Sequence, residues 1–348
     1  HTLEKHLFCI TTKCSEQNAF LETSEFWMML GNLSEVSEFK LLGFAEISHL
    51  ELQALLFVIF LTVYLLTVTE NIVIIALIIN HHQLHKPMYF FLGHLAFLEA
   101  WYISVTVPKL LLSFLVKSKS ISFTACMAQL FFFIALVCTE CVLLAVMACD
   151  RCVAICSPLR YAATMSPRLC LQLATGSWLL GFLMSVIKVF FISQLSFCAP
   201  GVINHFYCDI SPLLNLSCSG RRVAEMVDFV LALLILLIPL SVIIISYICI
   251  ISTVLSMPTA QNRMKASSTC ASHLAVVIIF FSATLFMYAR PRSARSLDLN
   301  KLVSIVYTVV TPMLNPLIYC LRNQEVKDTL LKVLCSTAAL SRVSAADH

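Results

Sequence analysis

The sequence predicts an all-α membrane protein, a single bundle of seven transmembrane helices with a short amphipathic eighth helix at the cytoplasmic end. Hydrophobic residues make up 59% of the 348 positions, whereas charged residues make up only 12%. Soluble domains average about 25% charged residues, so a chain this apolar needs lipid as part of its solvent. Seven apolar stretches are also close to the roughly 20 residues that cross the hydrocarbon of a bilayer.

These stretches place a seven-helix domain at 54–321, after a polar tail at 1–53 and before a cytoplasmic tail at 322–348. Backbone groups in lipid must be paired within their own segment, so each stretch is expected to be a helix. The sixth stretch is short, and its helix is expected to begin earlier, near Lys265. The expected spans are Ala54–Asn80, Tyr89–Leu112, Ala125–Ala148, Leu171–Ile192, Met226–Val254, His273–Tyr288 and Leu302–Leu321.

The N-terminal tail has no apolar core followed by a small-residue cleavage site, so it does not resemble a signal peptide. The chain begins with His1, and Met28 and Met29 are plausible natural starts. We therefore expect residues 1–27 to be an upstream extension or the edge of a fragment.

Sequons and cysteines predict which side of the membrane each end occupies. Lys and Arg are split nearly evenly between the two sides, so the positive-inside rule does not decide the orientation. Asn32 begins a glycosylation sequon in the N-terminal tail, and Asn215 begins another after the fourth span. The same side holds Cys126, Cys198, Cys208 and Cys218. Disulfides belong to an oxidising compartment, so we expect a plasma-membrane protein with its N-terminus outside and its C-terminus in the cytoplasm.

Four motifs carry the functional signal: HKPMYFFL (85–92), MACDRCVAICSPLRY (147–161), KASSTCASHL (265–274) and PMLNPLIY (312–319). In this order they resemble the olfactory receptors, a family of rhodopsin-like G-protein-coupled receptors whose second motif is MAYDRYVAICxPLRY. The resemblance extends from about Asn32 to Leu331. It implies a receptor rather than an enzyme, one that binds an odorant and activates a stimulatory, olfactory-type G protein to raise cyclic AMP.

The resemblance also implies a switch at the cytoplasmic end. Arg151 is a cation there, neutralised by Asp150 at rest and released on activation to meet the G protein. Pro316 lacks a backbone N–H and bends the seventh span, which allows the helix two arrangements. The other residues assigned to the switch are Tyr247, Lys265, His273, Asn315 and Tyr319.

Three residues depart from the family pattern near this switch. Cys149 and Cys152 stand where the family motif has tyrosines, and Ser267 stands where an aromatic residue is common. The loss of bulk near the G-protein contact is expected to lower basal or maximal signalling without abolishing it.

The family places its ligand between the outer halves of spans three, five, six and seven. At the position of the third span where amine receptors hold the ammonium of their ligand with an acid, this chain has Phe133. The expected ligand is therefore small, neutral and mostly apolar. The expected lining is Phe133, Ile134, Val137, Cys138, Leu231, Ala232, Ile235, Phe281, Thr284, Leu285, Tyr288, Ile305 and Thr308.

Ionisable residues inside spans are costly and ask for an explanation. Glu99 and Glu140 match the family's acidic positions, where a sodium ion held with Asn315, or a shared proton, would let two carboxylates coexist. Neutral, hydrogen-bonded acids are the alternative. Glu70 has no clear role, and Lys188 is expected to extend toward the outer interface.

Cysteine counting alone leaves three pairings open for the four cysteines on the outer side. The resemblance assigns Cys126–Cys208, which ties span three to the second extracellular loop, and Cys198–Cys218 within that loop. No cofactor is expected apart from the sodium ion.

The sequence also bears on three other classes of protein. A rhodopsin-like receptor for a non-odorant metabolite remains open. An ion-coupled transporter would show inverted repeats, and no internal repeat is visible. A membrane enzyme would need a recognisable catalytic set, which the sequence lacks. The net charge of +4 includes no long basic tract, so membrane lipid, and not nucleic acid, is the expected surrounding partner.

Overall fold

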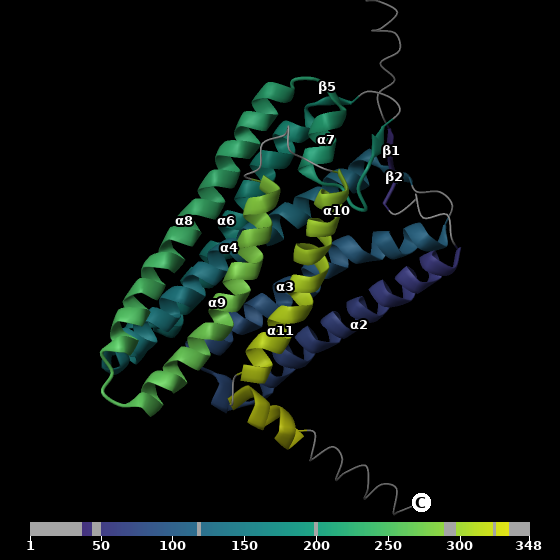
Figure 1. Cartoon of the computed structure of the whole chain (residues 1–348). Helices are drawn as coiled ribbons and strands as arrows, with labels where there is room; N and C mark the ends of the chain where they lie inside the picture. Colours follow the sequence, from purple (N-terminus) through teal and green to yellow (C-terminus); the bar gives the residue numbers. More distant parts are fainter. Residues whose placement is uncertain are drawn as a thin grey trace, which may run out of the picture.

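The computed structural model describes residues 37–43, 50–116, 120–197, 201–288, 297–322 and 325–333. They form a bundle of long helices with short strands gathered at one end (Figure 1). Asn32, Cys198 and the expected extension at 1–27 lie outside the described residues. The structure describes the backbone but not the side chain of Lys265, Ser267, Tyr288 and Tyr319.

Within the described residues, five helices are long and apolar enough to cross a membrane. They are α2 (Leu50–Asn80), α3 (Pro87–Leu115), α4 (Phe123–Cys156), α6 (Pro167–Ser193) and α8 (Arg221–Leu255). Each contains one of the first five expected spans, extended by polar turns that the apolar stretch alone does not reveal. The prediction of a helical membrane protein is confirmed.

The last two expected spans fall in a more irregular part of the bundle. α9 (Ala260–Tyr288) begins before Lys265, which confirms that the sixth helix starts earlier than its apolar stretch. In the next described segment, α10 (Leu297–Ile305) runs directly into the π-helical turn η4 (Val306–Val310) and then into α11 (Thr311–Arg322). Pro312 has no backbone N–H and cannot donate a hydrogen bond to the carbonyl four residues earlier. This missing hydrogen bond accounts for the wider helical turn at this point.

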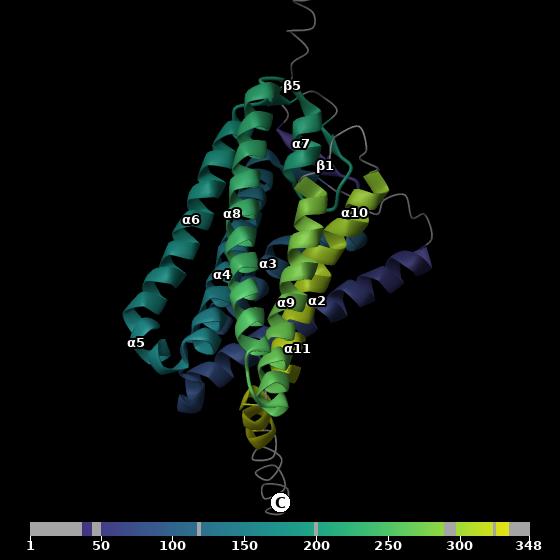
Figure 2. The ribbon, with the colours of Figure 1, turned by 60° about the vertical axis from the view of Figure 1, so that its left-hand side comes forward.

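α4 is the central helix of the bundle. In its most apolar window 83% of the residues are buried, against 11% for α2 at the edge. It packs against α3, α6, α8 and α9, and Figure 2 shows α6 and α8 alongside it. Residues on α4 therefore face several neighbours at once, which suits this helix to carry a site.

Short strands and one helix cover one end of the bundle (Figure 1). β1 (Glu38–Leu41) pairs antiparallel with β2 (Ser120–Ser122) and parallel with β4 (Val202–Ile203), while β3 (Ser196–Phe197) pairs antiparallel with β5 (Ser217–Ser219). α7 (Ile210–Leu216) lies in the same loop, between α6 and α8. Most side chains of residues 201–214 are buried, so the loop is packed into the bundle.

The opposite end has shorter connections. They include η1 (His82–Leu84), η2 (Pro158–Arg160) and α5 (Tyr161–Thr164). Residues 325–333 are also helical, with Val326 and Thr329 buried and Lys327 exposed. Lys86 and Tyr89 both donate hydrogen bonds to Glu325, which fixes this last helix against the start of α3.

Candidate functional site

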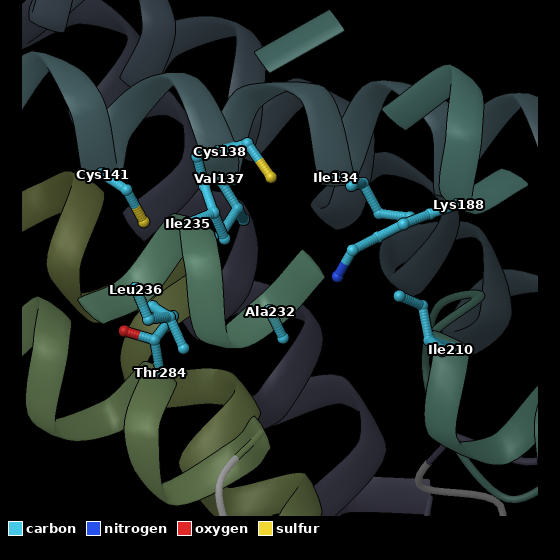
Figure 3. Close-up of a pocket in the computed structure, with 10 residues that line it drawn as sticks. All are labelled: Ile134, Val137, Cys138, Cys141, Lys188, Ile210, Ala232, Ile235, Leu236 and Thr284. Atoms are coloured by element: carbon cyan, nitrogen blue, oxygen red, sulfur yellow. The ribbon is translucent and has the colours of Figure 1, made fainter. Parts of the chain in front are cut away.

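A small cavity of about 20 Å³ lies between α4, α6, α7, α8 and α9 (Figure 3). This volume has room for about one water molecule. The cavity is lined mainly by aliphatic side chains and two thiols. Its lining is Ile134, Val137, Cys138, Cys141, Lys188, Ile210, Ala232, Ile235, Leu236 and Thr284.

The structure brings together part of the lining expected from the sequence. The expected residues that do line the cavity are Ile134, Val137, Cys138, Ala232, Ile235 and Thr284. The sequence missed Cys141, Lys188, Ile210 and Leu236. Of these, Cys141 and Leu236 lie one helical turn or less from expected residues, so the same helix faces would have suggested them.

The other expected residues lie around the cavity without lining it. Phe133 is fully buried and packs on Tyr207, with ring centroids 4.8 Å apart. Thr308 is buried and donates a hydrogen bond to the Ser304 carbonyl, 2.6 Å. Phe281 is buried, while Leu231, Leu285 and Ile305 are half-buried.

Lys188 contradicts the sequence-based expectation. Its side chain is only 4% exposed, and its Nζ donates to Asp228 Oδ1 at 2.8 Å. The expectation that it extends to the outer interface is therefore wrong, because the bundle interior supplies an opposite charge. In Figure 3 its amine points toward the cavity. An acid and a base in neighbouring spans were the sequence signal for this pair.

The loop that carries α7 closes one side of the cavity. The predicted Cys126–Cys208 disulfide is present, with Cα atoms 5.6 Å apart. The Cys208 backbone N–H also donates to Gln129 Oε1, 3.0 Å. The Tyr207 and Tyr307 hydroxyls hydrogen-bond to each other in the interior. The loop is thus fixed to α4 by a covalent bond and to η4 by a buried polar contact.

The second predicted disulfide remains a prediction. Cys218 is disulfide-bonded, but Cys198 lies outside the described residues.

His205 in the same loop is buried and shares a hydrogen bond with Ser304, 3.1 Å. Burial, together with nearby Lys301, lowers the pKa of His205 from 6.5 to about 3. The imidazole is therefore neutral at ordinary pH, and its ring stacks on Phe206.

The residues of the expected switch form two groups. In the first, Asp150 Oδ2 lies 3.9 Å from Arg151 Nη2, and the Tyr161 hydroxyl donates to Asp150 Oδ1 at 2.8 Å. Burial and this hydrogen bond raise the pKa of Tyr161, which keeps its hydroxyl protonated. In the second, the Tyr247 hydroxyl hydrogen-bonds to His273 Nδ1, 2.8 Å.

The departures from the family pattern lie beside these groups. Cys149 Sγ is 3.8 Å from Ser246 Oγ, and Cys152 Sγ is 3.8 Å from Cys156 Sγ. Both contacts are between small side chains, so this end of α4 lacks the bulk that two tyrosines would supply.

The acids of α3 and α4 meet at the centre of the bundle. Glu99 and Glu140 are 1% and 2% exposed and lie within hydrogen-bond reach of each other. Asn315 donates its amide to Glu99 Oε1. Glu99 Oε2 and Glu140 Oε1 are buried and have no hydrogen-bond partner among the described residues. This oxygen-rich set suits a proton or a hard monovalent cation.

Comparisons with known proteins agree with this architecture. The sequence profile of the olfactory receptor family matches residues 60–337. Human olfactory receptor 6B1 is 59% identical over 314 residues, covering 90% of this chain and 100% of the relative. Human olfactory receptor 6A2 is 56% identical, covering 88% and 93%, and rat olfactory receptor 226 is 57% identical, covering 86% and 92%.

The family profile covers most of the chain, and the relatives match it nearly from end to end. With the apolar helices, this similarity indicates a multi-pass protein of the plasma membrane. The chain belongs to the olfactory receptor family, whose members are receptors and not enzymes.

Proposed function

We propose that this chain is an odorant receptor that binds a small, neutral, mostly apolar molecule in the cavity between α4, α6, α8 and α9. Binding activates a stimulatory, olfactory-type G protein and raises cyclic AMP. The observation that carries this proposal is the small, largely apolar cavity on the central helix, where Ile134, Cys138 and Thr284 meet. Sites for small molecules are typically concave and apolar, with a few polar groups that orient the ligand.

The charges at the cavity favour a neutral ligand. Among the described residues that line the cavity, Lys188 alone is charged. Its ammonium is already paired with Asp228. A charged ligand would have to break this buried pair or be desolvated without a partner, which is costly. An apolar ligand with one hydrogen-bond acceptor would keep the pair and still reach the ammonium.

The cavity volume supports a conformational mechanism. At about 20 Å³ it is far below the roughly 300–1,000 Å³ of typical ligand pockets. Ligand binding therefore requires the helices around it to rearrange, and the ligand selects the rearranged state. The same rearrangement would release Arg151 from Asp150 at the other end of α4.

We propose seven spans, with α9 as the sixth and the continuous α10–η4–α11 segment as the seventh. The N-terminus is placed outside the cell, because the Cys126–Cys208 disulfide requires an oxidising compartment. The C-terminus is then cytoplasmic, with residues 325–333 as a short amphipathic eighth helix.

We also propose a sodium ion or a shared proton between Glu99, Glu140 and Asn315. The partnerless oxygens at this site support a bound cation. If sodium binds, replacing choline chloride by sodium chloride raises the melting temperature of the wild type and leaves a Glu99→Gln variant unchanged. Equal melting temperatures of the wild type in the two salts would favour the shared proton.

A cyclic AMP reporter assay tests the receptor proposal. Cells expressing the full chain are exposed to a panel of neutral odorants, with an Arg151→Ala variant expressed at the same surface level. A concentration-dependent rise in cyclic AMP that the variant lacks would support the proposal. A response that the Arg151→Ala variant retains in full would contradict the proposed coupling.

A further inference from the structure

A second, larger hollow lies on the same seam as the cavity. This groove, of about 400 Å³, runs between α4, α6 and α8. Its lining is Val142, Ala145, Val146, Cys149, Leu173, Leu180, Met184, Leu234, Ile235, Ile238, Pro239 and Val242. All these side chains are apolar or a thiol. Leu234 and Ile238 are 44% and 58% exposed, on helices apolar enough to cross a membrane, so the groove opens toward lipid.

The groove and the cavity share one side chain, Ile235 of α8. On α4, Cys141 of the cavity is followed directly by Val142 of the groove. On α6, Lys188 of the cavity is one turn from Met184 of the groove. The two hollows are therefore neighbours along one seam, and Ile235 is the wall between them.

The backbone is weakest beside this wall. Pro239 lies inside α8 and has no N–H, so the carbonyl of Ile235 lacks its usual helical hydrogen bond. Helices bend most easily at such positions. A small bend would move Ile235, whose side chain is 6% exposed.

Cys149 enlarges the inner end of the groove. The family motif has a tyrosine at this position, which would occupy part of the space that the thiol leaves free. The replacement of the family's tyrosine by Cys149 therefore leaves space both near the switch and in the groove.

The loop side of the cavity offers a less open route. Ile210 of α7 lines the cavity there, and the adjoining Cys208 is bonded to Cys126. Phe206 and Tyr207 are buried beside them. Passage on that side would displace a packed, covalently fixed loop, whereas passage from the groove would lead past Ile235, the side chain that lines both hollows.

We infer that the groove binds small apolar molecules dissolved in the bilayer and passes them to the cavity by movement of Ile235. This inference rests on the proposed function, since it supplies the route of the same ligand. The groove volume lies within the range of small-molecule sites, and its lining suits a neutral hydrocarbon chain. A molecule concentrated by partitioning into lipid reaches this opening without crossing the loop.

Photolabelling tests binding in the groove. The purified full chain, in phosphatidylcholine nanodiscs, is labelled with a neutral alkyl diazirine, with and without an excess of the same alkyl compound lacking the diazirine. We expect saturable labelling of residues 142–149 and 234–242. Ile238→Trp should reduce it about tenfold by filling the groove, whereas Ile245→Trp, an exposed site on the same helix outside the groove, should not.

Cys149→Tyr is a second groove-filling variant for the case in which Ile238→Trp does not fold. Labelling of these segments that excess competitor does not reduce in the wild type would mean ordinary exposure to lipid, and would overturn the inference without any variant.

Onset kinetics test the passage. After addition of a strongly membrane-partitioning odorant, Ile238→Trp should slow the rise of cyclic AMP several-fold relative to Ile245→Trp. Equal onset in the two variants would overturn the passage even if the wild type responds. Saturable labelling of a wild type that answers no odorant would support the groove as a binding site and count against the proposed function instead.

Discussion

At the scale of single residues, the buried ion pair between Lys188 and Asp228 determines the charge at the cavity. A surface ion pair is worth about 0–1 kcal/mol, whereas breaking a buried one costs about 3–5 kcal/mol because a charge stays desolvated. The same helix carries a more exposed pair, Arg221 with Glu225. The chain thus contains its own comparison between buried and exposed pairs.

We predict that Asp228→Asn destabilises the protein by about 3–5 kcal/mol, while Glu225→Gln costs about 0–1 kcal/mol. The reason is that Lys188 is 4% exposed, whereas Arg221 is 39% exposed. Thermal unfolding of the two purified variants measures the difference. Similar losses of stability in both would show that the Lys188 pair is solvated in the native state.

His205 makes the stability of the fold depend on pH. Its pKa is lowered to about 3 in the fold, below the usual 6.5, so its neutral form contributes stability that is complete above about pH 6.5 and lost as pH falls. At pH 5 the loss should be about 2 kcal/mol. His205→Gln should remove this part of the acid sensitivity, measured as melting temperatures at neutral pH and at pH 5. An equal acid shift in both proteins would place the sensitivity elsewhere.

The resemblance to the family identified part of the cavity lining through its motifs, including Val137 and Thr284. It missed Ile210, because the position of α7 depends on the Cys126–Cys208 bond and on loop packing that helical periodicity does not encode. Sequence reasoning misplaced Lys188, because the rotation of α6 toward Asp228 depends on contacts between helices. The rule that charged residues inside a membrane pair with opposite charges would have predicted the buried position of Lys188.

At the scale of helices, Gly181 sets how closely α6 approaches α4. A Cβ atom there would lie 2.6 Å from the Ala135 carbonyl oxygen and 2.9 Å from the Thr139 backbone N. Small residues allow such close packing of helices within membranes. Gly176, on the same helix, has nothing within 4 Å of its Cβ position.

We predict that Gly181→Ala destabilises the bundle by about 1–3 kcal/mol through overpacking. Gly176→Ala should be neutral or stabilise the helix by up to about 1 kcal/mol, since alanine is the better helix former. Melting temperatures of the two variants in the same detergent test this contrast. Equal stability of the two variants would show that α6 can shift away from α4 at little cost.

The long helices were predictable because apolar length alone marks α2, α3, α4, α6 and α8. Their ends were less so, since polar turns extend each helix beyond its apolar stretch. The π-helical turn at Val306–Val310 and the strands at the loop end escaped prediction. The π-helical turn depends on local backbone hydrogen bonds, whereas β1 pairs with strands far away in the sequence, and the apolar pattern reports neither.

At the scale of the whole molecule, three polar centres lie along one bundle: the Lys188–Asp228 pair, the Glu99–Glu140 pair and the group around Arg151. The central helix α4 carries Glu140 and Arg151 and lines the cavity, so the proposed mechanism couples the cavity to the other two levels through this helix. In the proposed mechanism, the small cavity and the contact between Asp150 and Arg151 belong to the resting state, from which ligand binding shifts the population.

The central claim is that the cavity binds the ligand, and Ala232→Phe tests it most directly. Ala232 lines the cavity and is 5% exposed, so a phenylalanine ring would occupy the space of about 20 Å³. Leu237→Phe, at a 49% exposed site on the same helix, is the matched control. The measurement is the concentration–response of cyclic AMP to an active odorant at equal surface expression. We predict an EC50 at least about tenfold higher for Ala232→Phe, a loss of about 1.4 kcal/mol, and little change for Leu237→Phe. An unchanged EC50 in Ala232→Phe would contradict the account and place the ligand elsewhere in the receptor.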